Sequence, residues 1–93
     1  MRERDVEAYL RDQVKAIGGI AYKFVSPGNA GVPDRLVLLP GGRVVFIELK
    51  ALGQKPTALQ TVQHARIRSL GFAVHVIDSK AAVDAWIREV KSE

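Results

Sequence analysis

Two runs of apolar residues joined by Pro40-Gly41-Gly42 constrain the fold of this chain more than any other feature. Residues 35–39 and 43–50 are rich in β-branched and other apolar side chains, which favour β-strands. Proline and glycine are the residues that tight turns select. The segment therefore predicts an antiparallel hairpin.

The hairpin lies between segments with helical periodicity. Apolar residues recur every three or four positions in residues 3–17 and again after Asp78-Ser79, and Gly18-Gly19 predicts the end of the first helix. Thr57 can cap a further helix, whose expected buried stripe is Leu59, Val62, Ile67 and Leu70. Residues 20–25 and 72–77 read as strands, and Trp86 falls in the core stripe of the last helix. The order is α-β-β-β-α-β-α. It predicts an α/β layer fold with a central mixed four-stranded sheet flanked by helices, in a single domain of residues 1–93.

Composition narrows the class of protein. The chain has 93 residues and no cysteine, which excludes disulfides and thiolate zinc sites and fits a reducing cytoplasm, and no signal-like or membrane-length apolar run is present. The net charge is +4. Residues 13–77 hold eight of the basic side chains but only two acidic ones, Asp34 and Glu48. Such a cationic body favours a polyanionic partner such as DNA, although an ordinary solvated basic surface has the same composition.

The two carboxylates of the central segment fall on the hairpin. Glu48 and Lys50 share one face of their strand because side chains alternate, and Asp34 begins the paired strand. Two converging carboxylates repel each other unless a hard divalent cation binds both. The pattern therefore predicts a Mg²⁺ or Mn²⁺ site for phosphodiester hydrolysis, with Lys50 adding a positive charge.

The register of the hairpin decides whether this site can form. A two-residue loop at Gly41-Gly42 would turn Asp34 to the face opposite Glu48, because a slip of one residue moves every side chain to the other face. We therefore predict an odd-length loop, or a bulge near Pro33-Asp34, that brings Asp34 onto the Glu48 face.

These residues carry a resemblance to a known family. Asp34 with Glu48-Leu49-Lys50 resembles the PD-(D/E)XK nuclease superfamily, and Pro33-Asp34 supplies its PD. The longer series of G31VPDR35, the Gly-Gly turn, I47ELK50 and Leu59-Gln60 resembles the VRR-NUC family in its small stand-alone form from bacteria and phages. The resemblance covers nearly the whole chain and implies a restriction-endonuclease-like fold.

The resemblance also implies roles for individual residues. Asp34, Glu48 and the carbonyl of Leu49 would bind the metal ion, Lys50 would activate the attacking water, and Gln60 would help to position the site. The family carries a glutamate on its first helix, for which Glu7 is the best match and Glu3 the second. Related enzymes are structure-selective endonucleases on branched DNA, including Holliday junctions. Because one small domain holds one site, symmetric cleavage implies a homodimer.

Other assignments and alternatives stay open. Lys23, Asn29, Arg35 and Lys55 are candidate DNA contacts. His64, one helical turn after Gln60, could face the site but is expected at the surface, and His75 is given no role. The domain could instead be a DNA-binding module that has lost turnover, because a fold does not fix a function. It could also be an interaction subunit whose basic face binds an acidic protein.

Overall fold

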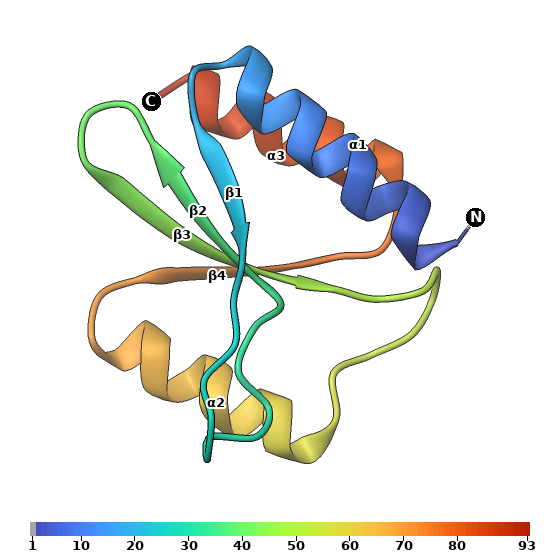
Figure 1. Ribbon diagram of the computed structural model, residues 1–93, viewed down its shortest axis with the longest axis vertical. Helices are drawn as coiled ribbons and strands as arrows, with labels where there is room; N and C mark the ends of the chain where they lie inside the picture. Colours follow the sequence, from blue (N-terminus) through green and yellow to red (C-terminus); the bar gives the residue numbers. More distant parts are fainter. Residues whose placement is uncertain (1) are drawn as a thin grey trace.

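The computed structural model describes residues 2–93, so Met1, the first residue of the predicted domain, lies outside the described residues. The elements are α1 (Glu3–Ala16), β1 (Ile20–Lys23), β2 (Arg35–Leu39), β3 (Arg43–Leu49), α2 (Ala58–Ser69), β4 (Ala73–Ile77) and α3 (Lys80–Lys91). The predicted order α-β-β-β-α-β-α is confirmed (Figure 1). No helix within residues 2–93 is long and apolar enough to cross a membrane.

The strands form one mixed sheet, as predicted, and their order in it is β1-β2-β3-β4. The β1–β2 and β2–β3 pairs are antiparallel, and β3–β4 is parallel, because α2 carries the chain from the end of β3 back to the start of β4. Helices α1 and α3 pack side by side on one face of the sheet, and α2 lies on the other (Figure 1). The architecture therefore has three layers, and the two faces of the sheet have different coverings.

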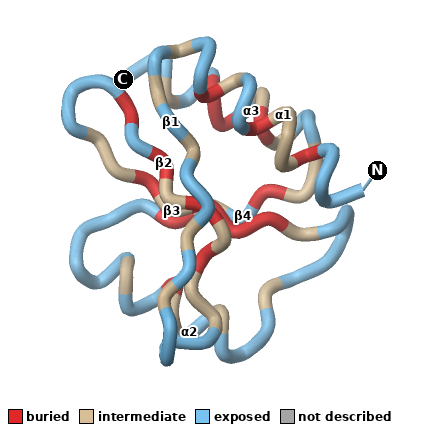
Figure 2. Tube along the Cα trace, in the orientation of Figure 1, coloured by how far each residue is buried: buried red, intermediate tan, exposed pale blue. Residues whose placement is uncertain are grey.

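The hydrophobic core fills the space between the sheet and the α1–α3 pair (Figure 2). Its helical side chains are the predicted apolar stripes, including Leu10 of α1 and Trp86 of α3. Alternating residues of β2 and β3, such as Val37 and Ile47, supply the sheet side and are fully buried. Apolar burial thus fixes which face of each strand points toward α1 and α3, and so which side chains point toward α2.

The apolar stripe predicted for the second helix is wrong. Leu59, Val62 and Leu70 are 52%, 51% and 77% exposed, and Ile67 is half-buried. The one fully buried residue of α2 is His64. The physical reason lies in the sheet beneath, where Glu48 is buried and requires hydrogen-bond donors, so α2 turns polar side chains inward.

Candidate active site

The β2–β3 register places Asp34 on the same face as Glu48. Leu39 pairs with Arg43, which leaves the three-residue loop Pro40-Gly41-Gly42, and Arg35 pairs with Ile47. Both loop glycines have positive φ, 84° and 77°, which glycine adopts without strain. The predicted odd-length loop is therefore confirmed. Extending the register by one pair sets Asp34 directly opposite Glu48.

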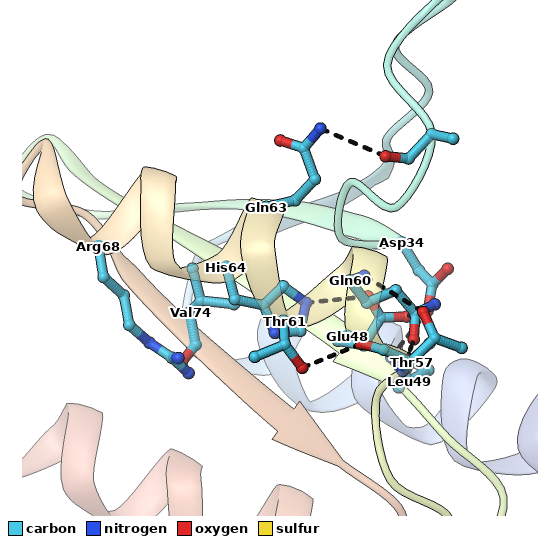
Figure 3. A network of polar contacts seen from close by, with 11 residues as sticks. Asp34, Glu48, Leu49, Thr57, Gln60, Thr61, Gln63, His64, Arg68 and Val74 are labelled. Carbon is cyan, nitrogen blue, oxygen red and sulfur yellow. Dashed lines mark hydrogen bonds and ion pairs between the residues drawn. The ribbon is translucent and has the colours of Figure 1, made fainter.

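Asp34 lies just before β2 and is fixed by contacts on both sides. Its Oδ2 accepts a hydrogen bond of 2.8 Å from the backbone N–H of Leu49, and its own carbonyl accepts one of 2.8 Å from the N–H of Phe24. Pro33, the residue before it, is buried. The carboxylate is consequently held against the C-terminal end of β3, beside Glu48 (Figure 3).

Glu48 is a buried carboxyl group, with 1% of its surface exposed. Its Oε1 lies 3.1 Å from Nε2 of His64, and its Oε2 accepts a hydrogen bond of 3.4 Å from Nε2 of Gln60. The pKa of Glu48 is raised to about 8, chiefly by burial and then by the neighbouring Asp34 carboxyl group, while the Lys50 ammonium opposes both. The charge of Glu3 acts in the same direction as Asp34.

Lys50 follows β3 and remains close to this pair. Its backbone N–H donates to the carbonyl of Ile77 at 3.0 Å, which extends the β3–β4 pairing by one residue. The side chain is half-buried, and its positive charge lowers the pKa of Glu48. The structure therefore brings together three of the predicted site residues: Asp34, Glu48 and Lys50.

Gln60 joins the start of α2 to the site. Its Oε1 accepts from the N–H of Thr57 at 2.9 Å, while Thr57 Oγ1 accepts from the N–H of Gln60 at 3.2 Å, a reciprocal capping box. Because the same side chain donates from Nε2 to Glu48, the orientation of the first turn of α2 and the position of the carboxylate depend on one residue.

Arg35 is not available to DNA, and the prediction that it contacts DNA is wrong. Only 5% of Arg35 is exposed, because alternation along β2 points it toward α1 rather than toward the face that carries Asp34. Its Nη2 forms an ion pair of 2.8 Å with Oε1 of Glu7, and its Nη1 donates to the carbonyl of Ala21.

The same ion pair bears on the choice between the two glutamates of α1. Glu7, the first choice from the sequence, has its carboxylate bound by Arg35. Glu3, one turn earlier, is the α1 residue whose charge acts on Glu48. The structure thus brings the second choice, rather than the first, into the electrostatic environment of Glu48.

The remaining candidate DNA contacts lie at the surface. Lys23 and Lys55 are exposed, at the end of β1 and in the loop before α2. Asn29 is also exposed, but its Nδ2 donates to Oγ of Ser26 at 2.9 Å, which is turn chemistry within the loop.

His64 is the site residue that sequence reasoning missed. The sequence placed it at the surface, whereas only 2% of it is exposed and its ring nitrogen contacts Glu48. Its position four residues after Gln60 puts both side chains on one face of α2 (Figure 3). That spacing was the available signal, but it could not reveal which face of α2 the sheet would cover.

The chemistry of the donors fits a hard divalent cation. The carboxylates of Asp34 and Glu48 and the carbonyl of Leu49 are all oxygen ligands. Within residues 2–93 no group of three His, Cys, Asp or Glu side chains forms a complete protein cage for a metal ion. Mg²⁺ is typically held by one or two carboxylates and retains several water molecules, so two carboxylates are a sufficient protein contribution.

Comparisons with known proteins agree with this architecture. No family model matches the chain. The chain is 56% identical over 80 residues to "Putative nuclease p44" of Acyrthosiphon pisum secondary endosymbiont phage 1, which spans 86% of each protein. It also superposes on a solved structure described as "VRR_NUC domain" with a TM-score of 0.88 and 37% identity, over 92% of this chain and 94% of that one. At this identity and coverage, the chain belongs to the VRR-NUC family of nucleases.

Proposed function

We propose that this protein is a structure-selective endodeoxyribonuclease that depends on Mg²⁺ or Mn²⁺ and hydrolyses phosphodiesters in branched DNA such as Holliday junctions. Residues 1–93 would act as one nuclease domain in the cytoplasm of a bacterial or phage-infected cell. The observation that carries the proposal is the hydrogen bond from Leu49 N–H to Asp34 Oδ2, which fixes one carboxylate opposite Glu48 and beside Lys50.

Each residue has a chemical role in this proposal. Asp34, Glu48 and the Leu49 carbonyl would hold the cation. When bound, the cation would lower the pKa of a water molecule and offset negative charge on the phosphoryl oxygens. Lys50 orients the attacking water and provides a positive charge next to the scissile phosphate. Gln60 keeps Glu48 in place. We assign the α1 carboxylate of the site to Glu3, because Glu7 is bound by Arg35.

The positive charge of the central segment supports DNA as the substrate. Residues 13–77 contain eight basic side chains and only two acidic ones, Asp34 and Glu48. Lys23, Lys55 and the loop at Asn29 would contact phosphates, which position DNA without reading its sequence. A protein that contacts mainly phosphates selects substrates by shape, as branched DNA requires.

An uncovered apolar surface supports a homodimer. Ile20, Tyr22, Leu38 and Phe72 are 50%, 53%, 39% and 43% exposed, and the strand register places them on the α2 side of the sheet. Apolar side chains gathered on one face are typical of interfaces. Two copies related by a two-fold axis would present two sites to the two symmetric strands of a four-way junction. A monomer at micromolar concentration in sedimentation velocity would contradict this part of the proposal.

The function can be tested with labelled DNA of different shapes. Four-way junctions, flaps and linear duplexes are incubated with Mg²⁺, with Mn²⁺ or with EDTA, using the wild type and Asp34→Ala. We expect paired incisions in the junction only with a metal ion and only with Asp34. Cleavage that persists in EDTA or in Asp34→Ala would refute the mechanism, and equal cleavage of all three substrates would refute the selectivity. Junction binding by the wild type without cleavage in either metal would identify a DNA-binding module instead.

A further inference from the structure

A buried histidine contacts the carboxylate at the centre of the site. His64 has 3% of its side chain exposed, and its Nε2 lies 3.1 Å from Glu48 Oε1, whose own side chain is 1% exposed. Burial lowers the pKa of His64, as does the positive charge of Arg68, which favours the neutral ring, and a neutral imidazole carries a single N–H. When Glu48 is ionised, as metal binding requires, its oxygens can only accept, which assigns that N–H to Nε2.

We infer that His64 is a positioning residue that fixes Glu48 for metal binding, an inference that rests on the proposed function. Glu48 receives one N–H on each oxygen, from His64 on Oε1 and from Gln60 on Oε2. Each oxygen retains a free lone pair, so the carboxylate can still bind a cation. Both donors come from one face of α2, whereas Asp34 approaches from β2. The two hydrogen bonds therefore restrict rotation of the Glu48 carboxylate about its last bond.

The surroundings of His64 point to a role in the site rather than in the core. Helix α2 buries no other residue completely, and the apolar side chains that could have packed on the sheet, Leu59 and Val62, are half exposed. A buried carboxylate without donors is costly, and hydrogen bonds to metal-binding carboxylates typically contribute 10–100-fold in metal affinity or activity. We therefore expect loss of the His64 N–H to weaken metal binding by about 10-fold or more.

The test separates the N–H donor from the volume of the side chain. His64→Leu removes the donor but still fills much of the volume of the side chain, whereas His64→Gln supplies an amide N–H at a similar reach. His75→Gln is the matched control, because His75 is a partly buried histidine whose ring lies 6.2 Å from that of Trp86, on the α1–α3 side of the sheet. Mn²⁺ affinity is measured by isothermal titration calorimetry at fixed pH without DNA, and thermal melting establishes that each variant is folded.

We expect His64→Leu to bind Mn²⁺ at least 10-fold more weakly than the wild type, and His64→Gln and His75→Gln to bind within about three-fold of it. In cleavage assays, the Mg²⁺ concentration for half-maximal rate should rise in His64→Leu.

Wild-type affinity in His64→Leu would overturn the inference while leaving the proposed function intact. Equal weakening in His64→Leu and His64→Gln would also overturn it, because packing rather than the donor would then matter. If His64→Leu does not fold, His64→Gln decides, since a loss of 10-fold or more there refutes the donor role. A wild-type protein that binds no Mn²⁺ would refute the proposed function itself, and the inference with it.

Discussion

The raised pKa of Glu48 makes the stability of the metal-free protein fall as the pH rises. In the folded chain this pKa is about 8, because of burial and the neighbouring Asp34, against 4.5 for an ordinary glutamate. The native state therefore binds more protons than the unfolded state between these two values, and the free energy of unfolding decreases with pH across that window. Removal of the Glu48 carboxylate, in Glu48→Gln, should abolish this loss while preserving the shape of the side chain.

The magnitude follows from the position of the pKa. His64 and His75 have lowered pKa values, so they act in the opposite direction, but that stability is lost only as the pH falls below their ordinary value of 6.5. Between pH 6.5 and 8, Glu48 dominates. A difference of one bound proton between the folded and unfolded states changes the free energy of unfolding by about 1.4 kcal/mol per pH unit. The wild type should therefore lose roughly 1.5 kcal/mol of this free energy between pH 6.5 and 8, because Glu48 becomes half ionised by the end of the interval.

Urea unfolding in EDTA at several pH values measures this loss. We expect the full slope in the wild type, a smaller slope in Asp34→Asn, where burial and the charge of Glu3 continue to raise the pKa, and no slope in Glu48→Gln. Saturating Mg²⁺ should remove the slope from the wild type, because the cation replaces the proton between the carboxylates. A wild-type stability that is flat from pH 6.5 to 8 in EDTA, or an unchanged slope in Glu48→Gln, would show that this carboxyl group is ionised at neutral pH.

Three further predictions concern other parts of the molecule. Glu7→Gln should lower the free energy of unfolding by about 1–2 kcal/mol in urea and leave the Mn²⁺ affinity unchanged, whereas Glu3→Gln should weaken Mn²⁺ binding and leave the stability unchanged. Weaker Mn²⁺ binding in Glu7→Gln but not in Glu3→Gln would assign the site carboxylate to Glu7. Gly31→Ala should lower the free energy of unfolding by about 2–4 kcal/mol, because φ is 88° and a Cβ would meet the α2 backbone at 3.0 Å. Gly28→Ala, where φ is 82° and the space is open, should lower it by only about 1 kcal/mol, and equal losses in the two variants would exclude the contact with α2. Tyr22→Glu should convert a dimer into a monomer in sedimentation velocity and stop paired incisions, because it places a charge on the exposed apolar surface. An unchanged dimer would show that this surface is not the interface.

The sequence predicted those parts of the fold that depend on apolar packing and on turn chemistry. The stripes of α1 and α3 were read correctly, because both helices pack on a mainly apolar sheet face. The odd-length loop followed from requiring Asp34 and Glu48 on one face, and Pro40-Gly41-Gly42 provides it.

The errors arose where polar side chains are buried. Periodicity assigns the apolar side of a helix to the interior, which fails for α2 because its partner in the sheet is a carboxylate. The same limit misplaced His64, and it misplaced Arg35, whose charge suggested DNA although its partner is Glu7. A buried ion pair or hydrogen bond depends on two distant residues, and a single sequence gives no measure of their distance.

In the proposed metal site, the polar attachment of α2 would couple the order of this helix to the binding of a cation. Elements with few buried apolar contacts open most readily, and α2 meets the sheet through the polar side chains of Gln60, His64 and Arg68. Replacing Gln60 and His64 with leucine or isoleucine would pack α2 on the sheet through apolar contacts and raise the stability of the fold. Glu48 would then lack hydrogen-bond donors, so the gain in stability would come with a loss of activity. Amide hydrogen exchange in α2 would consequently report on whether a cation occupies the proposed site, without any DNA present.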